Sequence, residues 1–184
     1  MGMRYYHLLS VIGLLVAAIA STSSDATAQA SRIRIPIYGR NAPVLVDSLA
    51  SAYDVKGSRA ATYTAAAQAL LQLGATLDHR DSVNAIVGMT NGQLRRRLGT
   101  IRLSRIVNCG SGLMGSYADI WRVYLSVYAF VDVIDSTSSR LRVAVVAGAR
   151  DVAGTSTRPV HCGSTGILEE MVHERVLRLL APPP

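Results

Sequence analysis

Five arginines lie within a short central segment and could together bind an anion. Guanidinium groups bind phosphate and carboxylate through paired hydrogen bonds, so a cluster of them is typical of a surface that contacts an anionic ligand. The segment therefore predicts an anion-binding or partner-binding surface. The alternative is a solvated face whose charges prevent a sheet edge from pairing with another chain. The five residues are Arg95, Arg96, Arg97, Arg102 and Arg105.

Cys109 and Cys162 are the only cysteines of the chain. In an oxidising compartment such a pair is typical of a disulfide, and we expect one between them. A nucleophilic or redox role for Cys162, beside His161, is the alternative. Neighbouring residues of a strand point to opposite faces, however, so adjacency in sequence does not make a catalytic pair.

Other combinations of reactive residues are weak. Glu170 and His173 have the spacing of a carboxylate-bridged metal site, but such sites need a second copy and further glutamates. No serine stands in a G-x-S-x-G context. The sequence thus predicts no catalytic residue, no metal site and no cofactor. A small hydrolase whose site forms only in the folded chain is the alternative.

The N-terminal segment predicts export. Arg4 precedes an apolar run from Leu8 to Ala20, and the later Ala28–Ala30 segment has the small residues of a signal-peptidase site. We expect residues 1–30 to be a cleaved signal peptide and the mature chain to be periplasmic or secreted. Cleavage after Ala28 and a retained N-terminal anchor are the alternatives. No later apolar run predicts a transmembrane span in the mature chain.

The charge of the chain indicates the kind of partner to expect. The formal net charge is +7 at pH 7. An excess of basic residues favours an anionic partner, which in the cell envelope is a protein or a lipid or glycan surface. Export argues against nucleic acid, so we expect no nucleic-acid partner.

Hydrophobic periodicity predicts a single α+β domain over residues 58–181. An extended arm over residues 31–57 precedes it, and a proline tail, residues 182–184, follows. Helical spacing of apolar residues predicts helices over 58–73 and 167–180. Ser58 is the expected N-cap of the first, and Gly74 follows its C-terminus.

Alternating apolar residues predict an antiparallel sheet between the two helices. Long strands over 118–134 and 140–150 form a hairpin, and shorter strands are expected over 75–79, 83–89 and 101–109, with a turn at Asn91-Gly92. One face of the first long strand is apolar, and the other, with its aromatic residues, is expected to face solvent. Two helices packed on a curved antiparallel sheet complete the expected fold.

The order of these elements resembles that of helix-grip domains. The helix that ends at Leu71, Leu73-Gly74, a strand near Leu77-Asp78, the strands that follow and the closing helix are similar to helix-grip domains such as those of the outer-membrane assembly lipoprotein BamC. The segments around Cys109 and Cys162 are also similar to a family of bacterial exported proteins. The resemblance implies a non-catalytic envelope module, or a domain that binds a small molecule between sheet and helix.

Overall fold

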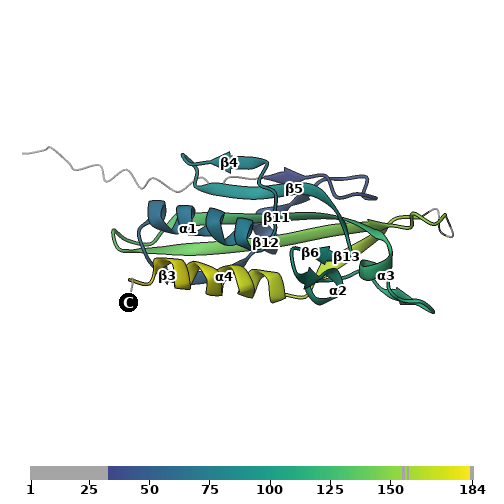
Figure 1. The fold of residues 1–184 in the computed structure, drawn as a ribbon. Coiled ribbons are helices and arrows are strands. Elements are labelled where there is room, and N and C mark those ends of the chain that lie inside the picture. Colours follow the sequence, from purple (N-terminus) through teal and green to yellow (C-terminus); the bar gives the residue numbers. More distant parts are fainter. Residues whose placement is uncertain (1–32, 155, 157, 183–184) are drawn as a thin grey trace, which may run out of the picture.

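The computed structural model describes residues 33–154, 156 and 158–182 and has the predicted α+β fold. The predicted signal peptide and the last two prolines lie outside these residues. A seven-stranded antiparallel sheet runs the length of the molecule (Figure 1). Its order is β4-β5-β11-β12-β13-β8, and β3 also pairs with β12. The strands are β3 (Ser51–Lys56), β4 (His79–Asp81), β5 (Ile86–Arg95), β8 (Val107–Asn108), β11 (Arg122–Val133), β12 (Ser138–Arg150) and β13 (Val160–Ser164).

Two long helices cover one face of the sheet, and shorter elements complete the fold (Figure 1). The helices are α1 (Arg59–Gln72), α2 (Leu103–Ile106), α3 (Tyr117–Ile120), α4 (Ile167–Leu180) and the 3₁₀ helix η1 (Val46–Leu49). Small hairpins are β1 (Arg34–Ile35) with β2 (Val44–Leu45), β6 (Arg97–Leu98) with β7 (Ile101–Arg102), and β9 (Ser111–Gly112) with β10 (Gly115–Ser116). None of the helices among the described residues is long and apolar enough to cross a membrane.

The signals at the ends of α1 are confirmed. The Ser58 hydroxyl accepts a hydrogen bond from the backbone N–H of Ala61, which would otherwise lack a partner in the first turn. Gly74 has a φ of +95° and ends the helix. A Cβ at this position would lie 2.6 Å from the backbone nitrogen of Gly99, so the glycine also allows the loop between β6 and β7 to approach.

The predicted hairpin is confirmed as β11 and β12, which pair without interruption from Arg122 opposite Arg150 to Val133 opposite Ser139. Alternate residues of β11, among them Val123 and Val127, belong to the main core beneath α1 and α4. The first strand begins later than predicted. The residues before it form α3 instead of extending the strand.

Asp135 closes the turn of this hairpin. Its carboxylate accepts hydrogen bonds from the backbone N–H groups of Thr137 and Ser138 and from both of their hydroxyls. These bonds favour the ionised form, the largest contribution coming from the Ser138 hydroxyl, and lower the pKa of Asp135 to about 2.

The turn is therefore expected to weaken in acid. A carboxylate with a lowered pKa stabilises the fold at pH values above its ordinary pKa of 3.8. This contribution is lost as the pH falls toward about 2. A carbon-detected NMR titration should give the low pKa for Asp135 directly. Stability of Asp135→Asn should depend less on pH in this window than that of the wild type, and an ordinary pKa at Asp135 would contradict the prediction.

The second face of the sheet is covered, contrary to the expectation that its aromatic residues face solvent. Tyr128 and Phe130 are 3% and 2% exposed and pack with Ile35 and Val46 from the segment before α1. The end of that segment is strand β3, which pairs with β12. The sequence region expected to be an extended arm thus contributes a strand of the sheet and a small second apolar layer.

Three of the shorter strands differ from prediction. Strand 75–79 is displaced to β4 (His79–Asp81), because the Asp81 carboxylate accepts the N–H groups of Val83 and Asn84 and makes the turn there. Strand 83–89 is β5, which continues through the expected Asn91-Gly92 turn. A bulge replaces that turn, because the Asn91 N–H donates to the Ser126 hydroxyl. Strand 101–109 is interrupted by α2.

Candidate functional site

Three arginines lie side by side across the sheet at the end where β5 stops. Arg95 of β5 is the register partner of Arg122 of β11, and Arg122 is the register partner of Arg150 of β12. Directly opposed residues of adjacent strands share one face, so the three side chains leave the sheet on the same side. Like charges in such positions destabilise a sheet. We call this set the arginine row.

The arginine row borders a pair of stacked tyrosines. Tyr124, two residues from Arg122, stacks on Tyr38 with ring centroids 4.2 Å apart, and the Tyr38 hydroxyl accepts a hydrogen bond of 2.9 Å from Arg150. Gly148 allows this arrangement, because a Cβ there would collide with the carbonyl oxygen of Tyr38. The N-terminal segment is thereby held against the sheet beside the row.

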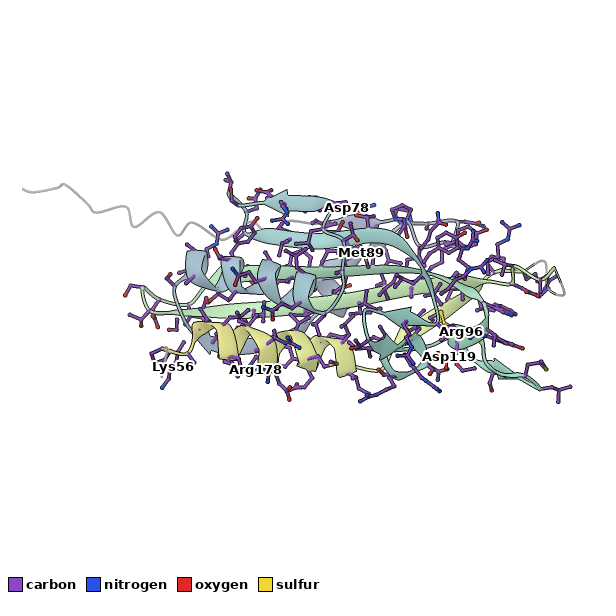
Figure 2. The ribbon with its side chains drawn as sticks, viewed as in Figure 1. Lys56, Asp78, Met89, Arg96, Asp119 and Arg178 are labelled. Carbon is purple, nitrogen blue, oxygen red and sulfur yellow. A yellow bond between two sulfur atoms is a disulfide. The ribbon has the colours of Figure 1, made fainter. Side chains whose placement is uncertain are left out.

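The five arginines predicted from the sequence are all exposed and belong to the same end of the molecule. Arg95 is part of the arginine row, and Arg97 and Arg102 are register partners in the β6–β7 hairpin. Arg96 has a left-handed backbone with a φ of +63°, which ends β5, and its carbonyl accepts the N–H of Leu103. Arg105 lies on α2, and Figure 2 labels Arg96 and Asp119 at the same end of the molecule.

The acidic residue of the segment from Arg95 to Arg122 is already bonded. Between Arg95 and Arg122 the sequence holds six arginines and one acidic residue, Asp119. One Asp119 oxygen accepts the backbone N–H of Ser104 at 3.1 Å and the other accepts its hydroxyl at 2.7 Å. The carboxylate therefore connects α2 and α3 through two hydrogen bonds. No ion pair between described residues involves any of the six arginines.

The predicted disulfide between Cys109 and Cys162 is confirmed and lies beneath the same region. It joins the residue after β8 to β13, whose pairing with β8 consists of two register pairs. The Thr165 hydroxyl adds a 2.6 Å hydrogen bond to the carbonyl oxygen of Arg105. The arginine-bearing segment is thus tied covalently and through hydrogen bonds to the sheet and the start of α4.

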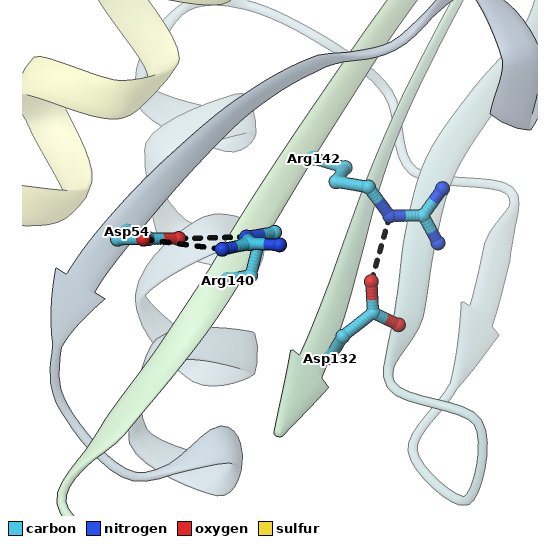
Figure 3. A network of polar contacts seen from close by, with 4 residues as sticks. All are labelled: Asp54, Asp132, Arg140 and Arg142. Atoms are coloured by element: carbon cyan, nitrogen blue, oxygen red, sulfur yellow. Dashed lines mark hydrogen bonds and ion pairs between the residues drawn. The ribbon is translucent and has the colours of Figure 1, made fainter. Parts of the chain in front are cut away.

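A second row of charges, at the opposite end of the same face, contains carboxylates as well as an arginine. Asp54 of β3 and Asp132 of β11 are the register partners of Arg140 on either side (Figure 3). Arg140 forms a 2.7 Å ion pair with Asp54, and Arg142 forms one of the same length with Asp132. The hydrogen bond from Arg140 lowers the pKa of Asp54. Here each arginine has a carboxylate partner.

The residues that could form a catalytic or metal site are Glu170, His173 and His161. The Glu170–His173 pair has a distance of 3.7 Å between Oε1 and Nδ1, and the His173 ring stacks on Tyr53. Burial and the nearby Glu170 carboxylate raise the pKa of Tyr53. No serine hydroxyl among the described residues bonds this histidine, and His161 lies exposed on β13. The described part of the chain contains no group of three His, Cys, Asp or Glu residues placed to hold a metal.

A small-molecule pocket on the second face would need accessible tyrosines. Tyr128 is packed in the second apolar layer, with its hydroxyl 2.5 Å from that of Thr90, and its pKa is raised by burial. Tyr124 is covered by Tyr38. A half-open depression of about 400 Å³ lies elsewhere, between the start of α1 and the turn before β5, with Arg59 and Tyr63 in its lining.

Sequence reasoning missed Arg122 and Arg150 as members of the site. The signal was available in the hairpin, because a turn near Asp135 places the first residue of one strand opposite the last residue of the other.

Comparison with models of known protein families and with curated proteins finds no match. The similarity to helix-grip domains stays a prediction.

Proposed function

We propose that this protein is a non-catalytic, exported module of the cell envelope that binds an anionic surface through its arginine-rich end. The observation that carries the proposal is the arginine row. Three like charges in register are unfavourable in the free protein, and an anion bound across Arg95, Arg122 and Arg150 would offset their repulsion.

Two further observations support the proposal. The exposed arginines of β6, β7 and α2 lie at the same end of the fold as the arginine row, since β6 contacts the end of β5, and they add to the positive charge of that end. The disulfide that holds this region forms in oxidising compartments, which agrees with export.

The test is a binding titration with fluorescent dextran sulfate, which is a soluble polyanion. The variant Arg95→Gln/Arg122→Gln/Arg150→Gln is expected to bind about 100-fold more weakly at low salt, if each arginine contributes about as much as one beside an anionic membrane surface. The loss should shrink as salt is added.

The matched control removes the same number of positive charges elsewhere. Lys56, Arg80 and Arg178 are exposed and belong to β3, β4 and α4, and their replacement by glutamine should change the affinity less than threefold, on the order of the screened long-range effect. Equal losses in both triple variants would mean attraction by net charge alone and would overturn the proposal. Thermal unfolding of each variant verifies that it is folded.

A further inference from the structure

The β9–β10 hairpin presents two apolar side chains at its tip. Gly112 pairs with Gly115, so Leu113 and Met114 alone form the connection. Leu113 is 109% exposed and Met114 is 86% exposed, relative to the reference values for their residue types. These are the two most exposed large apolar residues among those described. The hairpin extends from the body of the protein near α3 (Figure 1).

The turn itself does not require these residues. Connections of this length favour glycine, asparagine or aspartate, which adopt a positive φ readily. Here Gly115 takes the positive φ, at +110°, while neither Leu113 nor Met114 has one. The exposed apolar surface of these two side chains is therefore available to an apolar environment outside the chain.

The base of the hairpin is packed against the protein. The N–H of Tyr117 donates to the carbonyl of Gly110, and the Tyr117 ring stacks on Trp121 with centroids 4.1 Å apart. The same ring lies against Gly112, where a Cβ would be 3.0 Å from its hydroxyl oxygen. Trp121 belongs to the main core. The two tip residues are therefore held away from the surface by an ordered support.

Elements that carry arginines contact this support. Helix α3, which follows the hairpin, contacts α2, where Arg105 lies, and β5, which ends at Arg95. Ile120 of α3 adds a further apolar side chain that is 41% exposed. Asp119, the acidic residue between Arg95 and Arg122, is bonded to Ser104. An apolar tip flanked by arginines matches the interface of an anionic membrane, where acyl chains lie below phosphate groups.

We infer that the Leu113–Met114 tip inserts into the interface of a bilayer that contains anionic lipid, while the neighbouring arginines contact the phosphate groups. This inference rests on the proposed function and specifies the anionic surface as a membrane. Charge complementarity favours lipid headgroups. The shape does as well, because two side chains on a convex tip bury far less than the ~1,200 Å² of total surface that a stable protein interface requires.

Co-sedimentation with vesicles tests the inference. The vesicles are phosphatidylcholine alone, and a two-to-one mixture of phosphatidylcholine with phosphatidylglycerol. The wild type should bind the mixed vesicles, and Leu113→Ser/Met114→Ser should bind them at least about tenfold more weakly, since burial of a single leucine is sufficient for that change. Val133→Ser/Ile134→Ser is the matched control, because these two exposed apolar residues lie at the opposite end of β11 and should not matter.

Insertion has a second readout. Leu113→Trp keeps the tip apolar, and its added fluorescence should shift to shorter wavelengths with the mixed vesicles, whereas Val133→Trp should not shift. Unchanged binding by the serine variant of the tip, or an unshifted Leu113→Trp spectrum, would overturn the inference. Binding to dextran sulfate without binding to mixed vesicles would overturn it and leave the proposed function standing. Binding to neither would overturn both.

Discussion

Reduction of the Cys109–Cys162 disulfide is expected to lower the free energy of unfolding by about 4 kcal/mol. The bond joins residues 53 positions apart, and a crosslink over such a loop strongly restricts the unfolded chain. The pairing of β8 with β13, which the bond reinforces, consists of two register pairs. Urea unfolding with and without a reductant measures the difference.

The double variant Cys109→Ala/Cys162→Ala is the control for this experiment. It should be about as unstable as the reduced wild type and should not respond to the reductant. Both cysteines are buried, at 4% and 9% exposure, so the variant also loses a small amount of packing. A difference below about 1 kcal/mol between oxidised and reduced wild type would show that packing around Leu103 and Ile106 is sufficient to hold the segment.

Phe130→Ala is expected to cost about 3 to 5 kcal/mol, the range for truncation of a buried phenylalanine. Phe130 is among the largest fully buried side chains and belongs to the second apolar layer with Ile35 and Val46. The guanidinium of Arg142 also lies 5.2 Å from its ring centroid. The cavity should loosen the segment before α1 as well as the sheet.

Two measurements separate these effects. Urea unfolding gives the overall loss, and limited proteolysis of the segment from Ile33 to Leu49 reports its release from the sheet. Val133→Ala is the control on the same strand, because Val133 is 63% exposed and its truncation should change stability by less than about 0.5 kcal/mol. A similarly small loss for Phe130→Ala would mean that the N-terminal segment contributes little to the stability of the fold.

Local patterns were sufficient to predict the main elements. The apolar spacing in α1 and α4 and the alternation in β11 and β12 are properties of single segments, and both pairs formed as expected. The second layer was missed for a physical reason. The aromatic face of β11 is polar enough at Tyr124 and Tyr128 to suit solvent, and the segment that covers it lies far away in sequence. Periodicity does not encode such a pairing.

The short helices also depend on contacts between residues that lie apart in sequence. A strand was predicted through Leu103, but Asp119 accepts both the backbone N–H and the hydroxyl of Ser104 and stabilises a turn of helix there. For the candidate site, the sequence predicted an exposed cluster of arginines. It did not predict which of them face one another, because the arginine row depends on the registers of two strand pairs.

The two charge rows have a consequence for the approach to a charged surface. Arg140 and Arg150 lie on the same strand, and the rise of a β-strand places them about 33 Å apart. One charge row is balanced by Asp54 and Asp132 while the other carries excess positive charge, so the two rows make the charge of this face asymmetric along its length. At physiological salt the field extends about 8 Å, and within that distance an anionic surface would turn the protein so that its arginine-rich end arrives first.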